Sequence, residues 1–373
     1  MNVLIVGGGL QGLSCGCSLR DTGWRIDVIS DDLQIRNSRF FNTKYSEEVL
    51  FDVDAFLTIL KKYDIAIPMG DVYVSYLSKN KDRFEGESCC KCACPDYKKL
   101  EIVEDKHRFM AFCAANDIPC PKTVELTANT LNNCSTRIGF PSLIKPDFSV
   151  GARGITKVNS FEELQFWYPL ISKEYGNCTL QEFIDNQEFY YNVMMYRDQN
   201  GKILSSAVIK IVRMFPVKAG SSSCCISVDL PDLIAVCKNT LDKLKWVGMA
   251  DFDILQRLDN GEYKIIEINP RVPASLRGAA ISGVNFPEII INDLMGHPKK
   301  NYNYLPGRTL RYLGLDIMWL LKTKKLFNNN PSWLKFFGKN LYYQDIYAND
   351  LSTWWTWLAE GISKIGKRKQ KLR

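Results

Sequence analysis

Two acidic residues and a carboxamide near the middle of the chain have the types and spacing of a cation site. Asp253 precedes Glu267, and Asp259-Asn260-Gly261 between them has the composition of a hairpin loop. With residue 258 opposite residue 262, Asp253 lies opposite Glu267, and Asn269 points to the same face. Facing Cβ atoms are ~4.5–5.5 Å apart, and like charges there repel each other. The three side chains therefore need a cation, and their oxygen ligands suit Mg²⁺ or Mn²⁺.

The segments on both sides of this loop have the composition of strands. Residues 249–258 and 262–268 alternate between apolar and polar or run apolar. An ordinary solvated hairpin is the alternative, but the isoleucines and the phenylalanine in these segments argue against full exposure. Arg271 follows directly and suits a phosphate or carboxylate partner.

An earlier part of the chain has features that suit a polyphosphate. Lys145 ends an apolar strand over residues 142–146, and a loop over residues 149–154 with small side chains follows it. The backbone N–H groups of such a loop can surround phosphates, although an ordinary turn is the alternative. The loop residues that we place at the phosphates are Gly151, Arg153 and Gly154. A later strand edge, whose backbone could pair with an adenine, consists of Gln181, Glu182, Phe183 and Ile184, and Glu188 is suitably spaced for a ribose hydroxyl, although neither feature exceeds background on its own.

The first hundred residues alternate between strand and helix. Apolar strands are predicted over residues 3–6, 26–29 and 65–67, with a helix over residues 10–22, which is typical of a parallel α/β domain. Gly7, Gly9 and Gly12 fit G-x-G-x-x-G, and Asp31 lies about where a ribose acid would be. This turn occurs wherever a helix follows a parallel strand, so dinucleotide binding is the less favoured reading.

Composition limits the class of protein. The chain has 373 residues, of which 46% are hydrophobic and 24% charged, as in globular proteins. We find no apolar run of membrane-spanning length and no basic signal-peptide start, so a cytoplasmic protein is expected. The net charge is +7, but residues 361–373 carry six basic residues and no acid, so a nucleic-acid surface is not indicated. That basic tail is either a solvated end, which we favour, or a weak anchor for acidic lipids.

The cysteines are numerous but do not indicate a disulfide framework. There are 13, an odd number in a long chain, and most lie in apolar surroundings. Cys89-Cys90-Lys91-Cys92-Ala93-Cys94 is either a short strand of small residues, which we favour, or a metal site. His107 and His297 are the only two histidines, and zinc sites usually have separated cysteine pairs.

Taken together and in order, these motifs resemble the ATP-grasp superfamily, in its carboxylate–amine ligase and carbamoyl-phosphate-synthetase-like branch. The resemblance covers about residues 100–295 and rests on Asp105-Lys106, Ile144-Lys145-Pro146, the 149–154 loop, the 181–184 edge, Glu188, Asp253 and Glu267-Ile268-Asn269-Pro270-Arg271. The opening Gly7–Gly12 segment is similar to that of the lysine ligase of pyrrolysine biosynthesis.

The resemblance implies an α/β fold with three parts. A Rossmann-like domain without a dinucleotide site occupies residues 1–100, a two-lobed α+β ATP-grasp domain residues 101–300, and a small extension with a basic tail residues 301–373. It also implies that Lys106 and Lys145 contact ATP phosphates, and that Asp253, Glu267 and Asn269 bind two Mg²⁺ ions, with Glu267 bridging. Arg271 would stabilise the transferring phosphoryl group. The loop has fewer glycines than in many relatives, and Asp253 replaces a more common Glu or Gln.

The implied reaction is phosphorylation of a substrate carboxylate by ATP, followed by attack of an amine and release of ADP and phosphate. Such a step needs positioning and charge neutralisation more than a protein nucleophile. We also expect Arg213 and Arg277 to bind phosphate or the substrate carboxylate, with structural arginines as the alternative. The expected partners are a small-molecule acid and amine, with a homodimer as one assembly. Three alternatives are phosphorylation of bicarbonate or carbamate, an oxidoreductase that uses the glycine turn, and a nucleotide-binding module without turnover.

Overall fold

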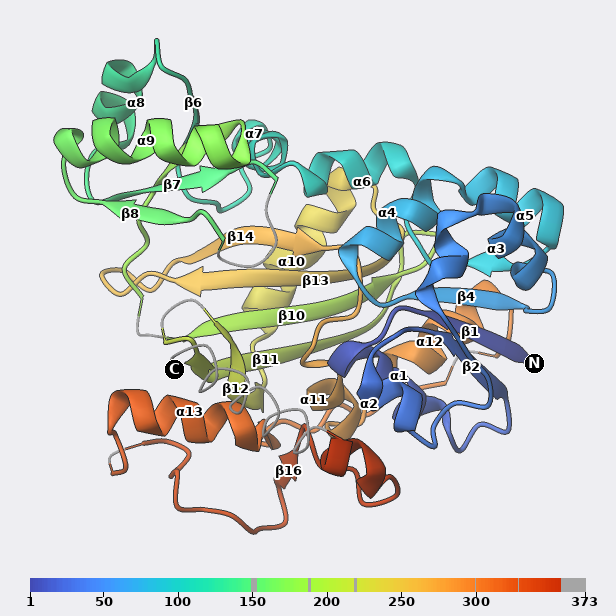
Figure 1. Ribbon diagram of the computed structural model, residues 1–373. Helices are drawn as coiled ribbons and strands as arrows, with labels where there is room; N and C mark the ends of the chain where they lie inside the picture. Colours follow the sequence, from blue (N-terminus) through green and yellow to red (C-terminus); the bar gives the residue numbers. More distant parts are fainter. Residues whose placement is uncertain (149–152, 187–188, 218–219, 299, 328, 357–373) are drawn as a thin grey trace, which may run out of the picture.

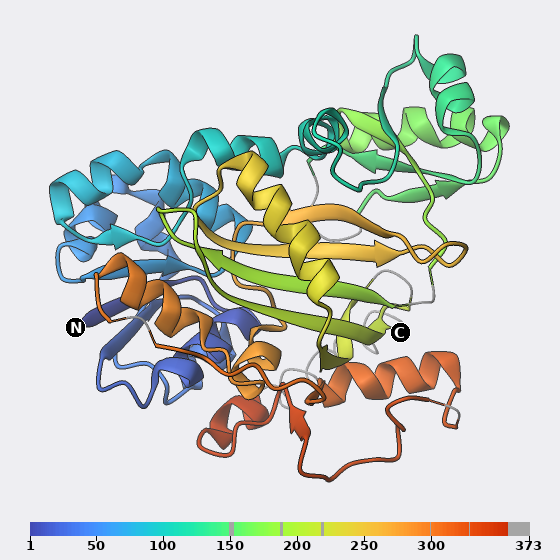
Figure 2. The same ribbon diagram turned by 180° about the vertical axis from the view of Figure 1, so that it is seen from behind.

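The computed structural model describes residues 1–148, 153–186, 189–217, 220–298, 300–327 and 329–356. A parallel sheet near the N-terminus lies beside a large, mostly antiparallel sheet, and a small lobe stands over one end of the large sheet (Figure 1). Seen from behind, a long helix crosses the back of the large sheet (Figure 2). The mixed α/β architecture expected from the sequence is confirmed.

The first sheet is parallel throughout, with strand order β3-β2-β1-β4-β5. Its central strand is fully buried from Val3 to Val6, as a parallel strand covered on both faces must be. The strands are β1 (Asn2–Val6), β2 (Arg25–Ile29), β3 (Lys44–Tyr45), β4 (Ile65–Pro68) and β5 (Lys91–Cys92). The helices are α1 (Gly9–Leu19), α2 (Leu33–Asn37), the 3₁₀-helix η1 (Glu47–Phe51), α3 (Val53–Leu60), α4 (Asp71–Lys79), α5 (Lys81–Ser88), α6 (Tyr97–Glu104) and α7 (Lys106–Ala115).

The glycine turn after β1 is built for close packing. Gly7 has a φ of 103°, and a Cβ atom there would lie 2.5 Å from the Tyr73 ring, so only glycine fits. The Asp31 carboxylate pairs with Arg36 and accepts hydrogen bonds from the Ser46 hydroxyl and the Glu47 N–H group. The acid suggested for a ribose is thus engaged within its own loop.

The small lobe is a four-stranded antiparallel sheet, order β6-β9-β7-β8, covered by two helices. The second helix begins after Ser160, whose hydroxyl accepts a hydrogen bond from the Glu163 N–H group at 3.3 Å. The elements are β6 (Thr123–Leu126), α8 (Leu131–Ile138), β7 (Ser142–Pro146), β8 (Thr156–Val158), α9 (Phe161–Tyr175) and β9 (Cys178–Glu182).

The large sheet has the order β14-β13-β10-β11-β12-β15-β16. Its last two strands come from the predicted C-terminal extension, so that extension completes the sheet instead of standing apart. The strands are β10 (Tyr190–Arg197), β11 (Ile203–Phe215), β12 (Ser221–Val228), β13 (Gly248–Gln256), β14 (Tyr263–Asn269), β15 (Thr309–Arg311) and β16 (Leu341–Tyr343). The helices are α10 (Pro231–Leu244), α11 (Leu276–Ile281), α12 (Phe286–Leu294) and α13 (Leu313–Thr323).

Two further points of the sequence analysis have structural counterparts. The cysteine run contributes the short strand β5, and Cys90, Cys92 and Cys94 are buried. Among the helices that the structure describes, none combines the length and apolar character needed to cross a membrane.

Candidate active site

The floor of the site is the β13–β14 hairpin, in which Asp253 pairs with Glu267 as predicted. The predicted loop was one residue too short, because the Arg257 N–H donates to the Glu262 carbonyl at 2.8 Å and leaves four residues between them. The register shifts between the Asp253–Glu267 pair and the next pair, Ile254 with Ile265, so Ile266 is an extra residue. The extra residue restores the predicted pairing of Asp253 with Glu267, because it compensates for the one-residue difference in loop length.

Burial makes the two carboxylates a strongly interacting pair. Burial raises the pKa of Asp253 well above its ordinary value, and the Glu267 carboxylate raises it further. Burial alone would also raise the pKa of Glu267, but the hydrogen bond from Asp253 and the charges of Lys106 and Lys145 lower it. The opposite pKa shifts have a common cause, because a hydrogen bond within the pair favours the protonated form of Asp253 and the charged form of Glu267.

Lys145 lies above this floor at the end of β7. Its side chain is 8% exposed, and burial lowers its pKa to about 8. The Glu267 carboxylate opposes this shift and the charge of Lys106 adds to it, so the two lysines and the floor share one electrostatic environment. Among the described residues Lys145 forms no ion pair with a carboxylate, and a buried lysine that faces carboxylates in this way suits an anionic ligand between them.

Two polar residues beside the floor were not predicted from the sequence. Asp251 lies opposite Asn269, and its Oδ1 atom is buried without a hydrogen-bond partner among the described residues. Burial raises the pKa of Asp251 well above its ordinary value, although Arg271 opposes this. Asn192 on β10 lies opposite Asp253 and donates from Nδ2 to its carboxylate. Asp251 precedes Asp253 by two residues in a strand, so the period-2 rule was a signal available in the sequence.

Arg271 connects the floor to the first domain. Its Nε atom donates to Asp71 at 2.7 Å, and its terminal nitrogen reaches Asn269 at 3.3 Å. Burial acts to lower the pKa of Arg271, but Asp71 and the acidic floor outweigh it and raise that pKa. Asp71 begins α4, so the N-terminal domain fixes the orientation of the predicted catalytic arginine.

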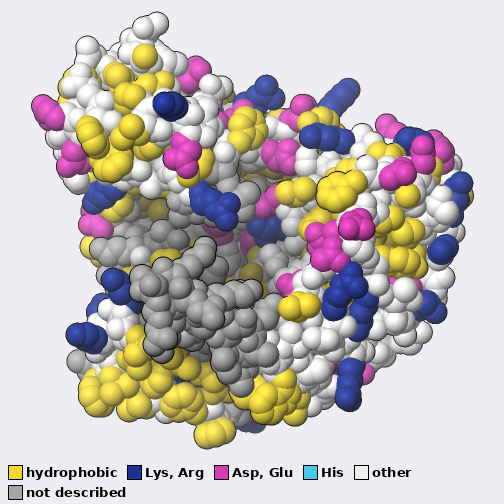
Figure 3. Space-filling view, in the orientation of Figure 1, with side chains coloured by type: hydrophobic (Ala, Val, Ile, Leu, Met, Phe, Trp, Pro, Cys, Tyr) yellow, Lys and Arg dark blue, Asp and Glu magenta, His cyan; other side chains and the backbone are white. Residues whose placement is uncertain are grey.

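The predicted adenine segment joins the small lobe to the hairpin. Gln181 is buried and donates from Nε2 to Thr123 at 2.9 Å, while Glu182 pairs with Arg257 of the hairpin at 2.9 Å. Ile184 is also buried, and the Lys157 ammonium lies 3.7 Å from the centre of the Phe183 ring. A cavity of about 450 Å³ opens beside Glu182 and Phe183 at the tip of the hairpin, away from the carboxylate floor. In Figure 3 a hollow lies below the small lobe, with acidic and basic side chains at its visible edge.

The predicted phosphate loop is described only in part. Gly151 and the predicted ribose acid Glu188 lie outside the described residues. Arg153 is exposed. Gly154 has a φ of 74°, and a Cβ atom there would lie 2.7 Å from Pro146, so glycine is required where the loop returns to β7.

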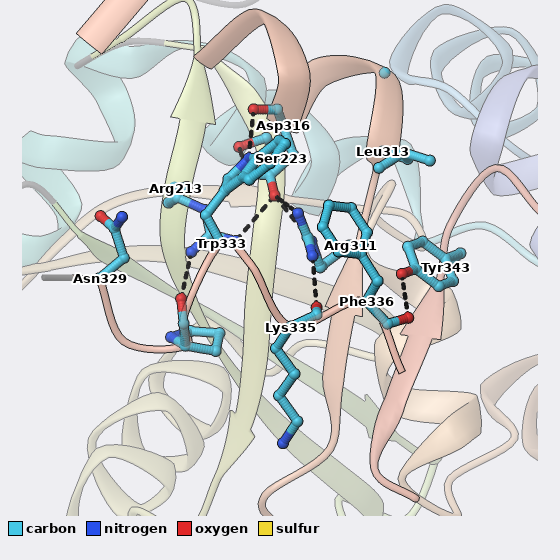
Figure 4. Close-up of polar contacts among 12 residues, drawn as sticks. Arg213, Ser223, Arg311, Leu313, Asp316, Asn329, Trp333, Lys335, Phe336 and Tyr343 are labelled. Carbon is cyan, nitrogen blue, oxygen red and sulfur yellow. Dashed lines mark hydrogen bonds and ion pairs between the residues drawn. The ribbon is translucent and has the colours of Figure 1, made fainter. Parts of the chain in front are cut away.

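Arg213 and Arg277 make structural contacts instead of lining the floor. Arg213 is 3% exposed, binds both Asp316 oxygens at 2.7 and 2.9 Å, and donates to the Pro331 carbonyl. Arg311 also binds Asp316, so two arginines approach one carboxylate (Figure 4). Arg277 donates to the Ile346 carbonyl at 3.0 Å and stacks 3.8 Å from the Tyr347 ring. Both predicted substrate arginines hold the C-terminal residues in place, and we do not retain them as substrate ligands.

The donors at the floor fit an ATP-bound divalent cation better than a metal held by protein alone. Among the described residues, no group of three or more His, Cys, Asp or Glu side chains is placed to hold a metal ion. Asp253, Glu267 and Asn269 supply two carboxylates and one amide. Mg²⁺ commonly takes few protein ligands and completes its shell with phosphate oxygens and water.

Comparison with known proteins identifies the fold family. Residues 103–275 match the family described as the ATP-grasp domain, so the chain contains an ATP-grasp domain. Over 252 residues the chain is 25% identical to the D-aspartate ligase of Enterococcus faecium strain Aus0004, a match that covers 62% of this chain and 59% of the ligase. The chain spans less than two thirds of the length of the curated relatives that it matches first.

Solved structures share the arrangement of most of this chain. N5-carboxyaminoimidazole synthetase from Staphylococcus aureus complexed with ADP superposes with a TM-score of 0.68 at 15% identity, over 89% of this chain and 87% of that one. The biotin carboxylase domain dimer of 2-oxoglutarate carboxylase from Hydrogenobacter thermophilus, with MgADP, ADP and bicarbonate, gives 0.66 at 16% identity, over 82% and 72%. At such identities these likenesses show the fold.

Proposed function

We propose that this protein is an ATP-dependent, ADP-forming carbon–nitrogen ligase that phosphorylates a small-molecule carboxylate and joins it to an amine. The observation that carries the proposal is the partly buried, facing pair of Asp253 and Glu267 beneath Lys145. Like charges buried together are costly unless a cation or proton offsets them, and MgATP brings that cation. The ligase named among the relatives supports the amine acceptor.

Each retained residue has a role that follows from its surroundings. Lys106 and Lys145 neutralise phosphate charge, and Asp253, Glu267 and Asn269 hold Mg²⁺, two ions in the arrangement that the family resemblance implies. A cation held by these residues would neutralise phosphate charge that otherwise repels an incoming carboxylate. Arg271, held by Asp71, orients toward the phosphoryl group. The segment from Gln181 to Ile184 holds the adenine, and Gly151, Arg153, Gly154 and Glu188 remain predicted contacts.

Phosphorylation of bicarbonate is the second candidate function. A neighbour in fold was solved with MgADP and bicarbonate, which favours this candidate. The two functions differ in the acid that stimulates ADP release, so they can be separated by assay in buffer freed of carbon dioxide.

An oxidoreductase built on the glycine turn has less support. Asp31 is engaged by Arg36, Ser46 and Glu47, and that function would leave the Asp253–Glu267 pair unexplained. A nucleotide-binding module without turnover would keep the floor but release no ADP with any acid.

The proposal is tested by ADP release with a panel of amino acids, sugar acids and bicarbonate against a panel of amines. Glu267→Gln should reduce Mg²⁺-dependent ADP formation by at least about a thousandfold, since it removes the bridging charge. Glu262→Gln makes the same change on an exposed part of the hairpin and should be active. Equal turnover in the wild type and Glu267→Gln would refute the metal assignment.

The remaining predictions concern assembly and location. A homodimer is proposed, because one neighbour in fold was solved as a domain dimer. A cytoplasmic location and domain boundaries near residues 100 and 300 stay predictions, and weak lipid contact by the basic tail stays the less favoured alternative to a solvated end. The tail lies outside the described residues.

A further inference from the structure

One end of the molecule exposes apolar side chains that the fold itself does not bury. Figure 3 shows hydrophobic side chains gathered at the lower edge of the view, where Figure 1 places α13 and the segment that follows it. We call the following group the C-terminal apolar surface: Ile317, Met318, Leu321, Phe327, Leu334 and Phe337.

Helix α13 contributes two different faces. Asp316 and Trp319 point inward, where Asp316 binds Arg213 and Arg311 beneath the helix (Figure 4). Leu321 on the other face is 67% exposed, and Ile317 one turn earlier is exposed with it. The buried face already attaches the helix to the sheet, so the outer apolar face is not needed for that attachment.

The segment after α13 also has one side that contacts the fold and one side that is exposed. The Trp333 ring nitrogen donates to the Asp316 carbonyl at 3.1 Å, and Arg311 lies 5.0 Å from the Phe336 ring. Leu334 and Phe337, each next to one of these inward residues, face outward, and Phe337 is 90% exposed. The inner contacts hold the backbone in place and thereby present the outer side chains.

The charged side chains of the segment that carries this surface have one sign. Residues 317–340 contain five lysines and no Asp or Glu. All five lysines are exposed: Lys322, Lys324, Lys325, Lys335 and Lys339. Large apolar side chains bordered by lysines match a surface with an apolar interior and a negatively charged boundary.

We propose that the C-terminal apolar surface docks the protein onto a membrane that contains anionic lipids. Phenylalanine and leucine side chains enter the boundary between headgroups and acyl chains, and the lysines contact the anionic headgroups. The contact is peripheral and places the enzyme at the membrane surface. This inference does not depend on the proposed reaction, because none of the residues involved belongs to the carboxylate floor.

The test is co-sedimentation of the full-length protein with vesicles of phosphatidylcholine alone or with about one third phosphatidylglycerol. The wild type should sediment with the anionic vesicles at low salt and be released at high salt, because the Debye length falls to about 3 Å at 1 M. Lys322→Gln with Lys324→Gln should weaken binding by about fivefold for each charge removed. Leu321→Ser with Phe337→Ser should weaken it at least as much.

Matched controls are available on the first domain. Phe51 is 88% exposed, so Phe51→Ser removes an equally exposed phenylalanine far from the surface and should bind vesicles normally. Lys61→Gln with Lys62→Gln removes two exposed adjacent lysines and should also bind normally. A third variant, with Lys364, Lys367 and Arg368 changed to Gln, reports the contribution of the basic tail.

Several results would overturn the proposal. One is failure of the wild type to sediment with anionic vesicles at low salt. Another is equal loss of binding in the surface variants and their controls, or loss in the tail variant alone. Dissociation of an oligomer by Leu321→Ser with Phe337→Ser, seen by light scattering without vesicles, would show that a second copy covers this surface.

Discussion

From the facing carboxylates we predict that Asp253→Asn stabilises the protein in the absence of metal and removes the stabilisation that Mg²⁺ and ADP give to the wild type. Asp253→Asn keeps the shape of the side chain, and its oxygen can still accept the hydrogen bond from Asn192. Above the raised pKa of Asp253, two full charges about 5 Å apart would interact with about 3 kcal/mol at an effective dielectric constant of 20. Removing this repulsion should raise the free energy of unfolding by up to about that amount in EDTA.

The size of this gain depends on pH. In the unfolded chain Asp releases its proton near pH 3.9, whereas the pKa of Asp253 in the folded protein is raised. Between these two values the folded state binds more protons, so wild-type stability falls as pH rises, and Asp253→Asn does not share this fall. The advantage of the variant should therefore be largest at the upper end of the range from pH 5 to pH 8.

Urea unfolding with and without Mg²⁺ and ADP measures both effects. The wild type should gain about 2.7 kcal/mol when the ligand is at a hundred times its dissociation constant, and Asp253→Asn should gain little. Asp259→Asn, at the exposed tip of the same hairpin, is the matched control. The reasoning is refuted if Asp253→Asn is less stable than the wild type in EDTA at pH 8, or if it keeps the full gain with Mg²⁺ and ADP.

Three other residues give further predictions. Lys145→Met should raise the KM for ATP at least about tenfold. The stability of the wild type relative to this variant should rise from pH 8 toward pH 10, because the pKa of Lys145 is lowered to about 8 and the unfolded chain binds more protons in this range. Parallel curves of unfolding free energy against pH, measured by urea titration, would contradict this. Asp71→Asn should lower kcat by roughly tenfold with little change in the KM for ATP, because Arg271 loses the carboxylate that holds its side chain. Steady-state kinetics measure both constants, and an unchanged kcat would argue against the positioning role of Asp71. Asp316→Asn should lower the free energy of unfolding by roughly 3–5 kcal/mol, because it leaves Arg213 and Arg311 buried without a carboxylate. ADP formation per folded molecule should stay normal. A folded but inactive variant would support the original prediction that Arg213 binds substrate.

The floor of the site could be predicted from the sequence because its residues lie close together along the chain. Asp253, Glu267 and Asn269 belong to one hairpin, so strand alternation places them on one face. The loop length was wrong by one residue, and the pairing was nevertheless correct, since the bulge at Ile266 compensates. Bulges leave little trace in a single sequence, because the extra residue here is one more isoleucine in an apolar run.

Contacts between distant parts of the chain were not predictable in the same way. Arg271 and Asp71 are 200 residues apart, and Arg213 and Asp316 are 103 residues apart. In both cases the sequence shows an arginine near the β13–β14 hairpin, but it does not show which acid contacts that arginine. Arg271 remains at the floor, whereas Arg213 is taken up by the C-terminal helix α13.

The strands that the C-terminal residues add to the large sheet bear on how the protein can be divided. A fragment that ends near residue 300 would lose β15, which pairs with Cys224, Cys225 and Ile226 of β12. The outer edge of β12 would then offer unpaired N–H and C=O groups beside apolar side chains, a template for strand addition between molecules. Aggregation of such a fragment would thus arise from an opened sheet edge and would not measure the folding of the ATP-grasp domain.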